Sequence, residues 1–436
     1  MKRTAFLFAG LFLSGIGLWG CGDVQDIHDP AVIESQERQE AQGKKELVLA
    51  GIDLDSGICL AVTAFNQLSD DTVVILRDYG DGSGVVSDTV QGRIYGDVIN
   101  GDIPDMYMMS PTSVWPLDRL NAQGVFVDLY PFLDRDPRIS RDDLFSTVLE
   151  TVQRDDTLFY FPVSYTLNGI WGVPEYCNGN RFPVDRISGL RQLFPQHDML
   201  FGAFTPMDLI NMEVSQNPDL YVNWKTGTCD FTSRRFLDTL EAACDLPKYR
   251  PAGREEMMDY AAGVYLLEGR QFFAPYTISD FESYLMKTED VAFHPYGGDM
   301  VSVTLTDSQV VLDIRSAFAI TSACGDPETA WQFLRTFLEM EYQQSLPTAT
   351  APALPINVHA FTAETDKLLA ENKGTEAGFV RILELVESAR AVTGSTDIRM
   401  ESMISEAVSA CFSGQKTVEE TARMIQDQVS AYLMED

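Results

Sequence analysis

The chain has 436 residues, with 65 acidic and 32 basic side chains and a formal net charge of -33. This acidic balance argues against nucleic-acid binding and against broad adhesion to anionic lipid, because both need clustered Lys and Arg. A chain of this length exceeds one ordinary hydrophobic core, so we expect two lobes.

The N-terminus has the pattern of an export signal. Lys2 and Arg3 precede an apolar run of about 16 residues, which is short for a membrane-spanning helix. The run ends in "LWGC", residues 18–21, and polar residues follow. This order resembles the bacterial lipobox, although Trp19 stands where a small residue is usual. The resemblance implies a signal peptide over 1–20, diacylation of Cys21, and a flexible tether over 21–45; an ordinary signal peptide with a coincidental cysteine is the alternative.

Strand and helix patterns alternate directly after the tether. Short apolar runs predict strands, and runs with a helical period predict helices between them. The predicted order is strand 46–52, helix 58–68, strand 72–79, helix 87–100 and strand 104–109. This β-α-β-α-β alternation is typical of an α/β fold with a parallel sheet, whose ligands bind beyond the carboxyl ends of the strands. The loops of interest are therefore 53–57, 78–84 and 110–116.

Two later helices carry clear start signals. Asp326 is a candidate N-cap with Pro327 in the first turn, and the apolar spacing predicts one helix to about residue 344. Thr417 with Glu420 three residues later predicts a capping box at the start of the last helix.

The cysteines do not form a metal-binding pattern. Seven are present, no C-x-x-C occurs, and the chain has four His, so we expect no metal site and no cofactor. Cys229 and Cys244 flank a 14-residue segment and are the pair best placed for a disulfide, with buried free thiols as the alternative. The other cysteines that remain after lipidation are Cys59, Cys177, Cys324 and Cys411.

Six segments together resemble one family. They include "INGDIPDMYMM" (99–109), "VFVDLYPFLDRDPRI" (125–139) and "SAFAITSACGDPETAWQFLRTFLEMEYQQ" (316–344). The others are 155–175, 354–361 and 406–436, and all six stand in the family's order. They are similar to the extracellular solute-binding proteins of ABC importers, in particular the carbohydrate-binding group that includes maltodextrin-binding proteins.

The resemblance implies a two-lobed, periplasmic-binding-protein-like clamp, with a mainly parallel sheet flanked by helices in each lobe. One lobe would comprise 46–160 plus 300–350, and the other 161–299 plus 351–436. A solute would bind in the cleft between them, and the closed monomer would dock on the permease. The protein would lie outside the cell, tethered to the outer face of the membrane.

Sugar sites need flat aromatic platforms and polar groups that hydrogen-bond to hydroxyls. By family position, Tyr276 matches a stacking tryptophan of the maltodextrin-binding relatives. Arg399 and Glu401 fall near another of their aromatic positions, where this chain departs from them. The full set of candidate ligand-binding residues is Asp53, Asp55, Ser110, Thr112, Trp115, Tyr165, Thr166, Asn168, Tyr276, Tyr296, Arg399 and Glu401.

Structural roles compete with these assignments. Asp53 and Asp55 can serve as turn formers or helix caps, which is a common role of Asp at such positions. Trp115 and Tyr276 can equally pack in the core.

Three other functions stay open. The same clamp can bind a polyamine, a peptide or a metal chelate, and it can act as a surface adhesin or sensor partner. A glycoside-acting enzyme would need two carboxylates at a defined separation. No G-x-S-x-G or H-E-x-x-H motif occurs in the sequence. We therefore expect a binding protein and not an enzyme.

Overall fold

The computed structural model describes residues 43–80, 88–109, 117–172, 181–182, 205–246, 271, 273–282, 284, 299–303, 310–348, 352–392 and 398–434. The predicted signal peptide, Cys21 and most of the predicted tether lie outside the described residues. A search of the described helices for a segment that combines the length and the hydropathy of a bilayer span finds none.

The first part of the chain forms three parallel strands with helices between them. Strand β1 (Lys45–Gly51) lies between β2 (Thr72–Asp78) and β3 (Met106–Met109), and both neighbours run parallel to it. Helices α3 (Ser56–Leu68) and α4 (Asp88–Asn100) make the two connections. The predicted β-α-β-α-β alternation is confirmed, with ends shifted by a residue or two at most positions.

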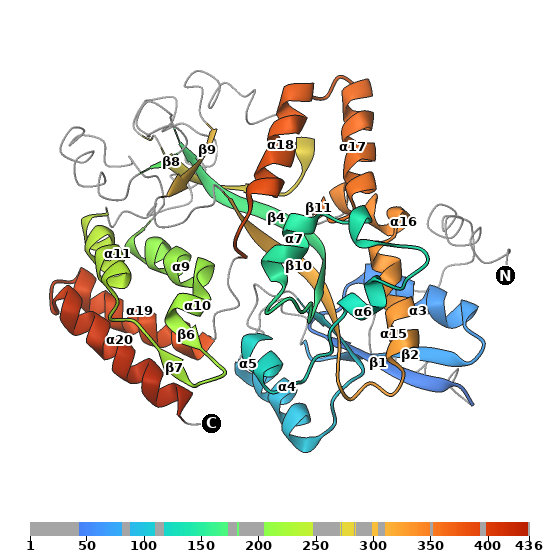
Figure 1. Cartoon of the computed structure of the whole chain (residues 1–436), viewed down its shortest axis with the longest axis horizontal. Coiled ribbons are helices and arrows are strands. Elements are labelled where there is room, and N and C mark those ends of the chain that lie inside the picture. The colour runs from blue at the N-terminus through green and yellow to red at the C-terminus, as the bar shows by residue number, and fades with distance from the viewer. Residues whose placement is uncertain are drawn as a thin grey trace, which may run out of the picture.

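Two long strands continue this sheet through the middle of the molecule. Strand β10 (Val310–Ile320) pairs with β3 through its last residues, and it pairs with β4 (Phe161–Gly172) along most of its length. The full strand order is β2-β1-β3-β10-β4-β9-β5, and β8 and β11 also pair with β4. Figure 1 shows β4 and β10 running side by side between the helices on either side. The remaining strands are β5 (Arg181–Phe182), β8 (Phe273–Ile278), β9 (Asp299–Val303) and β11 (Leu354–Pro355).

The sheet is mixed in direction. The expectation of parallel pairing holds for β1, β2 and β3, and also for β5 with β9. The ladders that β4 forms with β8, β9, β10 and β11 are all antiparallel. The described part of the sheet around β4 is therefore not mainly parallel.

Helices cover both ends of the sheet. Figure 1 shows α9, α11, α19 and α20 packed together on one side, and α3, α4 and α15 on the other. The predicted capping box is present, since the Thr417 side chain accepts from the Glu420 N–H and Glu420 returns the contact. The other elements are α5 (Leu117–Ala122), α6 (Tyr130–Leu133), η2 (Arg141–Asp143), α7 (Ser146–Val152), α9 (Pro206–Gln216), α10 (Pro218–Tyr221), β6 (Val222–Asn223), β7 (Thr228–Cys229), α11 (Arg234–Asp245), η7 (Leu346–Thr348), α17 (Val358–Ala370), α18 (Glu376–Ser388), α19 (Ile398–Phe412) and α20 (Val418–Leu433).

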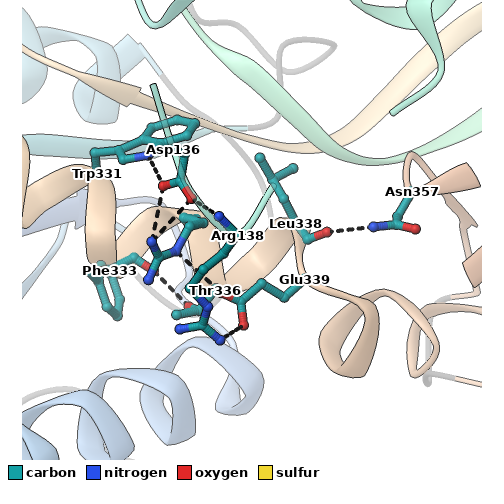
Figure 2. A network of polar contacts seen from close by, with 9 residues as sticks. Asp136, Arg138, Trp331, Phe333, Thr336, Leu338, Glu339 and Asn357 are labelled. Atoms are coloured by element: carbon teal, nitrogen blue, oxygen red, sulfur yellow. Dashed lines mark hydrogen bonds and ion pairs between the residues drawn. The ribbon is translucent and has the colours of Figure 1, made fainter. Parts of the chain in front are cut away.

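The predicted helix from 326 to 344 is broken in the structure. Asp326 does cap its start, accepting from the Thr329 N–H. The chain then runs as α15 (Pro327–Leu334), the 3-10 turn η6 (Arg335–Leu338) and α16 (Met340–Gln343). Glu339 has an extended backbone, with ψ of 153°, and this ends the helical path. Polar side chains take the carbonyls freed at the break, as Asn357 Nδ2 does for the Leu338 oxygen at 3.0 Å (Figure 2).

The predicted disulfide between Cys229 and Cys244 is wrong in this structure. The Cys229 thiol lies against Ser430 on α20, at 3.2 Å. The Cys244 thiol lies against Cys411 on α19, at 3.5 Å. The segment between Cys229 and Cys244 forms α11, which points the two thiols at different helices. No disulfide joins any two of the described cysteines.

Candidate functional site

The loop after β1 is held by the carboxylate at the end of β2. Asp78 accepts hydrogen bonds from the backbone N–H groups of Asp53 (2.9 Å), Leu54 (3.0 Å) and Gly80 (2.7 Å). Asp53 has a φ of 50°, in the left-handed region that Asp tolerates better than most residues. A Cβ on Gly80 would lie 1.9 Å from Asp53 Oδ1, so the two loops fit together only with glycine there. The Asp53 carboxylate is therefore held in a defined place at the carboxyl edge of the sheet.

Asp55 serves as a helix cap. Its Oδ1 accepts from the Ile58 N–H at 3.0 Å and so starts α3. Asp55 is exposed and also lies near Tyr342 on α16. Burial first, and the Asp55 charge second, raise the pKa of the Tyr342 hydroxyl. Tyr342 is a neighbour of this loop that the sequence analysis did not single out.

A strip of polar side chains crosses the three central strands. Thr277 on β8 donates to Asn168 Oδ1 on β4 at 2.7 Å, and Asn168 Nδ2 donates to Asp313 Oδ2 on β10 at 3.4 Å. Arg315 Nη1 lies 3.5 Å from the same Asp313 oxygen. We name Asn168, Thr277, Asp313 and Arg315 the central-strand polar strip, because three of the four lie on the long strands β4 and β10.

Two atoms beside the strip are buried and have no hydrogen-bond partner among the described residues. They are Thr166 Oγ1 and Asp313 Oδ1. Thr166 stands opposite Asp313 in the β4–β10 ladder, so both side chains share one face of the sheet. An unpaired buried polar atom costs roughly 1–3 kcal/mol, so each of these atoms lowers stability unless it gains a partner.

Tyr165 and Tyr276 lie on the opposite face of the sheet from the strip. Side chains alternate along a strand, and Tyr276 stands opposite Gly169 whereas Thr277 stands opposite Asn168. Tyr165 is fully buried, and Tyr276 packs against the hydrophobic core. Burial raises the pKa of both phenols. The structure thus brings together Thr166 and Asn168 of the candidate residues, but it places neither tyrosine beside them.

Arg399 and Glu401 lie in the first turn of α19, within the helix group of α9, α11 and α20. Both are exposed, and the Arg399 guanidinium lies 5.2 Å from the centre of the Tyr432 ring on α20. This cation–π contact gives Arg399 a local packing role. The candidates Ser110, Thr112, Trp115 and Tyr296 lie outside the described residues.

Asp313 and Arg315 were missed by the sequence analysis. The available signal was the stretch "VVLDIRS" (310–316), in which two charged residues alternate with apolar ones inside a strand. Such alternation gives a strand one apolar and one polar face. Among the described residues, no group of three or more His, Cys, Asp or Glu side chains is arranged to hold a metal ion.

A second Asp–Arg cluster has a structural role. Asp136 accepts from Trp331 Nε1 at 2.7 Å, from the Arg138 N–H at 2.8 Å and from Arg335 Nη1 at 3.0 Å (Figure 2). Glu339 lies 3.2 Å from the Arg335 Nε and 2.7 Å from Arg138 Nη2. These contacts join 125–139 to 316–344, two of the segments on which the family resemblance rests. Arg335 Nε and Glu339 Oε1 lie within ion-pair distance of each other but make no hydrogen bond among the described residues. The cluster is nearly buried and joins two segments, which gives it a structural role.

Comparison with known proteins identifies the fold. The chain aligns along most of its length with a structure described as the sugar-binding protein MalE from Xanthomonas citri, at a TM-score of 0.61 and 11% identity, covering 90% of this chain and 98% of that one. It also aligns with the cyclic alpha-maltosyl-1,6-maltose binding protein from Arthrobacter globiformis, at 0.57 and 14% identity, covering 90% and 100%. A family 1 extracellular solute-binding protein from Alicyclobacillus acidocaldarius gives 0.54 and 13% identity, covering 89% and 98%. No protein-family model and no curated protein matches the sequence.

The chain therefore has the two-lobed, α/β fold of the periplasmic-binding-protein class. More closely, it has the fold of the family 1 extracellular solute-binding proteins, the one the sequence motifs resemble. The identities of 11–14% establish the fold, and the ligand has to be argued from the site.

Proposed function

We propose that this protein is an extracytoplasmic receptor that captures a carbohydrate, in particular an oligosaccharide, between its lobes and delivers it to an ABC permease. Its lobes are 46–160 plus 300–350, and 161–299 plus 351–436. It breaks and forms no bond in its ligand. The observation that carries the proposal is the central-strand polar strip, three of whose four residues lie on the long strands β4 and β10.

The chemistry of the strip suits hydroxyl groups. Asp313 offers acceptors and Arg315 offers donors, and the two are 3.5 Å apart. A sugar hydroxyl both donates and accepts, so neighbouring hydroxyls can bridge such a pair. Thr166 Oγ1 adds a further group without a partner among the described residues.

The same pairing argues against a polyamine. A cationic ligand needs carboxylates whose charge is not already compensated, and Arg315 compensates Asp313. A neutral polyol meets no such competition. The sugar-binding descriptions of the aligned structures from Xanthomonas citri and Arthrobacter globiformis support the same choice.

A ligand screen tests this proposal. The protein is heated in the presence of linear and cyclic glucans, other oligosaccharides, polyamines and peptides, and hits are measured by titration calorimetry. We expect one sugar class to bind at about micromolar Kd, with about 2.7 kcal/mol of stabilisation at 100 times Kd. Binding of polyamines or peptides alone would overturn the sugar assignment.

The strip is tested by Arg315→Ala. Loss of a charged hydrogen-bond donor should weaken sugar binding by about 10- to 100-fold. The matched control is Arg423→Ala, because Arg423 is exposed on α20 and its Nε donates to the Glu419 carbonyl of its own helix, at 3.2 Å. Equal affinities for the two variants would remove the strip from the binding site.

We also propose that Cys21 is diacylated, so that a monomer is tethered at the outer face of the membrane near its permease. Cells fed an alkyne fatty acid should label the wild-type chain, and Cys21→Ala should abolish the label and release the protein from the membrane. Retention of the label in that variant would contradict the anchor.

A further inference from the structure

Two thiols far apart in the sequence lie side by side. Cys244 stands near the end of α11 (Arg234–Asp245), and Cys411 stands near the end of α19 (Ile398–Phe412). Their Sγ atoms are 3.5 Å apart, although 167 positions separate them in the chain. Cys411 is 7% exposed, and Cys244 is half-buried. Figure 1 shows α11 packed beside the hairpin of α19 and α20.

We propose that Cys244 and Cys411 form a disulfide in the exported protein. A disulfide needs an S–S separation of about 2.05 Å, so the sulfurs must approach by about 1.5 Å. Side-chain rotation can supply this movement, since the two helices are already in contact. The proposal rests on the extracytoplasmic location given under Proposed function, because such compartments let disulfides persist.

The other described thiols do not have this arrangement. Cys229 faces Ser430 and Gln426 on α20, and Cys59 is buried in α3. Cys324 lies in the turn that leads into α15. Burial raises the pKa of Cys229 and Cys324, which lowers their reactivity at neutral pH.

The oxidant is a protein or small-molecule disulfide of the exported compartment. The Cys244 thiolate, as the more accessible one, attacks a sulfur of that disulfide, forms a mixed disulfide and releases one thiol. The Cys411 thiolate then attacks the Cys244 sulfur and releases the second thiol. Two protein thiols and one disulfide thus become one protein disulfide and two thiols, and the electron pair passes to the oxidant.

The bond would join the 205–246 segment to the C-terminal hairpin within one lobe. Closing so long a loop restricts the unfolded chain, so the gain in stability belongs to the large end of the range for disulfides. Cys244 and Cys411 belong to the same proposed lobe, so the bond does not connect the two lobes. We therefore expect it to leave the polar strip and the ligand affinity unaffected.

Peptide mapping tests the bond directly. The full mature chain, purified from an oxidising compartment without reductant, is digested and analysed by mass spectrometry. We expect a cross-linked pair of peptides that contain Cys244 and Cys411. Reduced protein treated with oxidised glutathione should give the same pair and become two hydrogens lighter. Free thiols at both positions after this treatment, or a bond from either cysteine to another such as Cys177, would overturn the proposal.

Variants give an independent measurement. Cys244→Ala, Cys411→Ala and the double variant should all lower the Tm of the oxidised protein by a similar amount, about 5 °C or more. Dithiothreitol should lower the Tm of the wild type and of the control Cys229→Ala, but not that of these three variants. Additive losses in the double variant would contradict the bond. Neither peptide mapping nor the Tm measurements require a ligand. Both can therefore be interpreted even if the protein does not bind a sugar.

Discussion

Two regions of the molecule each contain an Asp–Arg ion pair, and the two pairs differ in their exposure and in their contacts. Asp136 and Arg335 lie 3.0 Å apart, with side chains 3% and 12% exposed, and Asp136 also accepts from Trp331 and from the Arg138 N–H. Asp313 and Arg315 lie 3.5 Å apart, with side chains 14% and 50% exposed, and Asp313 Oδ1 has no partner among the described residues. We call the first pair closed, because both side chains are nearly buried and the pair joins two segments, and the second open, because the Arg315 side chain is half exposed.

This difference separates stability from binding. A buried ion pair holds a fold only if its remaining hydrogen-bonding groups are satisfied. Groups left unsatisfied lower stability, and they are retained where a ligand uses them. Variants of the two pairs should therefore affect different measurements.

The largest effect is expected at the closed pair. Asp136→Ala leaves Arg335 and the Trp331 N–H buried without their acceptor, which should lower the free energy of unfolding by about 3–5 kcal/mol. Chemical denaturation measures the loss. The control Asp134→Ala removes an exposed partner of Arg141 and should cost about 1 kcal/mol or less. Equal losses would show that the buried cluster does not stabilise the fold.

The open pair should respond in the opposite way. Asp313→Asn keeps the shape of the side chain but removes the charge, so the free energy of unfolding should change by about 1 kcal/mol or less. Ligand affinity should fall by about 10- to 100-fold, since hydrogen bonds to a charged acceptor are lost. Calorimetry on Asp313→Asn and Asp134→Asn makes the comparison. An unchanged Kd together with a large loss of stability would reverse the roles assigned to the two pairs.

The loop beside the first strand provides a third test. In Gly80→Ala the new Cβ meets Asp53 Oδ1 at 1.9 Å and the Asp53 nitrogen at 2.6 Å, so the loop must shift. Overpacking of this kind costs about 1–3 kcal/mol. Gly92→Ala is the control, because its Cβ meets nothing within 4 Å and helix α4 gains about 0.5–1 kcal/mol. Stability is read from denaturation; similar values for both variants would contradict the close fit at Gly80.

The smallest effect is a dependence on pH. Burial alone would raise the pKa of Asp136, but hydrogen bonds from Arg138, Trp331 and Arg335 outweigh it and lower the pKa below 3.8. Asp136 therefore stabilises the protein above that value, and the contribution is lost as the pH falls through the folded-state pKa. Trp331→Phe removes one donor to Asp136, so the free energy of unfolding should fall less steeply as the pH drops below 3.8. Urea denaturation at a series of pH values measures this dependence. The same dependence in the variant and the wild type would show that the Trp331 indole does not act on Asp136.

Glu339 affects the pH dependence of the free energy of unfolding in the opposite direction to Asp136. Its burial outweighs the nearby Arg138 and Arg335 and raises its pKa above 4.5. The folded state therefore holds the proton more tightly than the unfolded chain, and stability falls as the pH rises from about 4.5 through the folded-state pKa. The two carboxylates together favour a stability maximum in mildly acid solution.

Local signals allowed the correct parts of the fold to be predicted. The strands and helices from 45 to 109 follow from apolar periodicity, and Asp326 and Thr417 cap helices as their neighbours in sequence suggest. The break at Glu339 was missed because its cause is tertiary: partners come from 136–138 and from Asn357.

The candidate site was predicted less well, for reasons of register and distance. Asn168 and Tyr276 were placed together, but the β4–β8 register sets them on opposite faces, and a shift of one residue would reverse this. The partner of Cys244 lies on a helix 167 positions away, which spacing in the sequence cannot indicate. Asp313 and Arg315 come together with Asn168 only through the β4–β10 ladder.

The irregularity in that ladder has a mechanical consequence. The register between β4 and β10 shifts on both sides of Ser316, so the strand carries a bulge next to Arg315. A bulge interrupts the regular hydrogen bonds and lets a strand bend more easily there than elsewhere. If the two proposed lobes change their angle by bending β4 and β10, these strands bend most easily at this bulge. Bending of the backbone at the bulge would then change the distance between the Arg315 guanidinium and the Asp313 carboxylate.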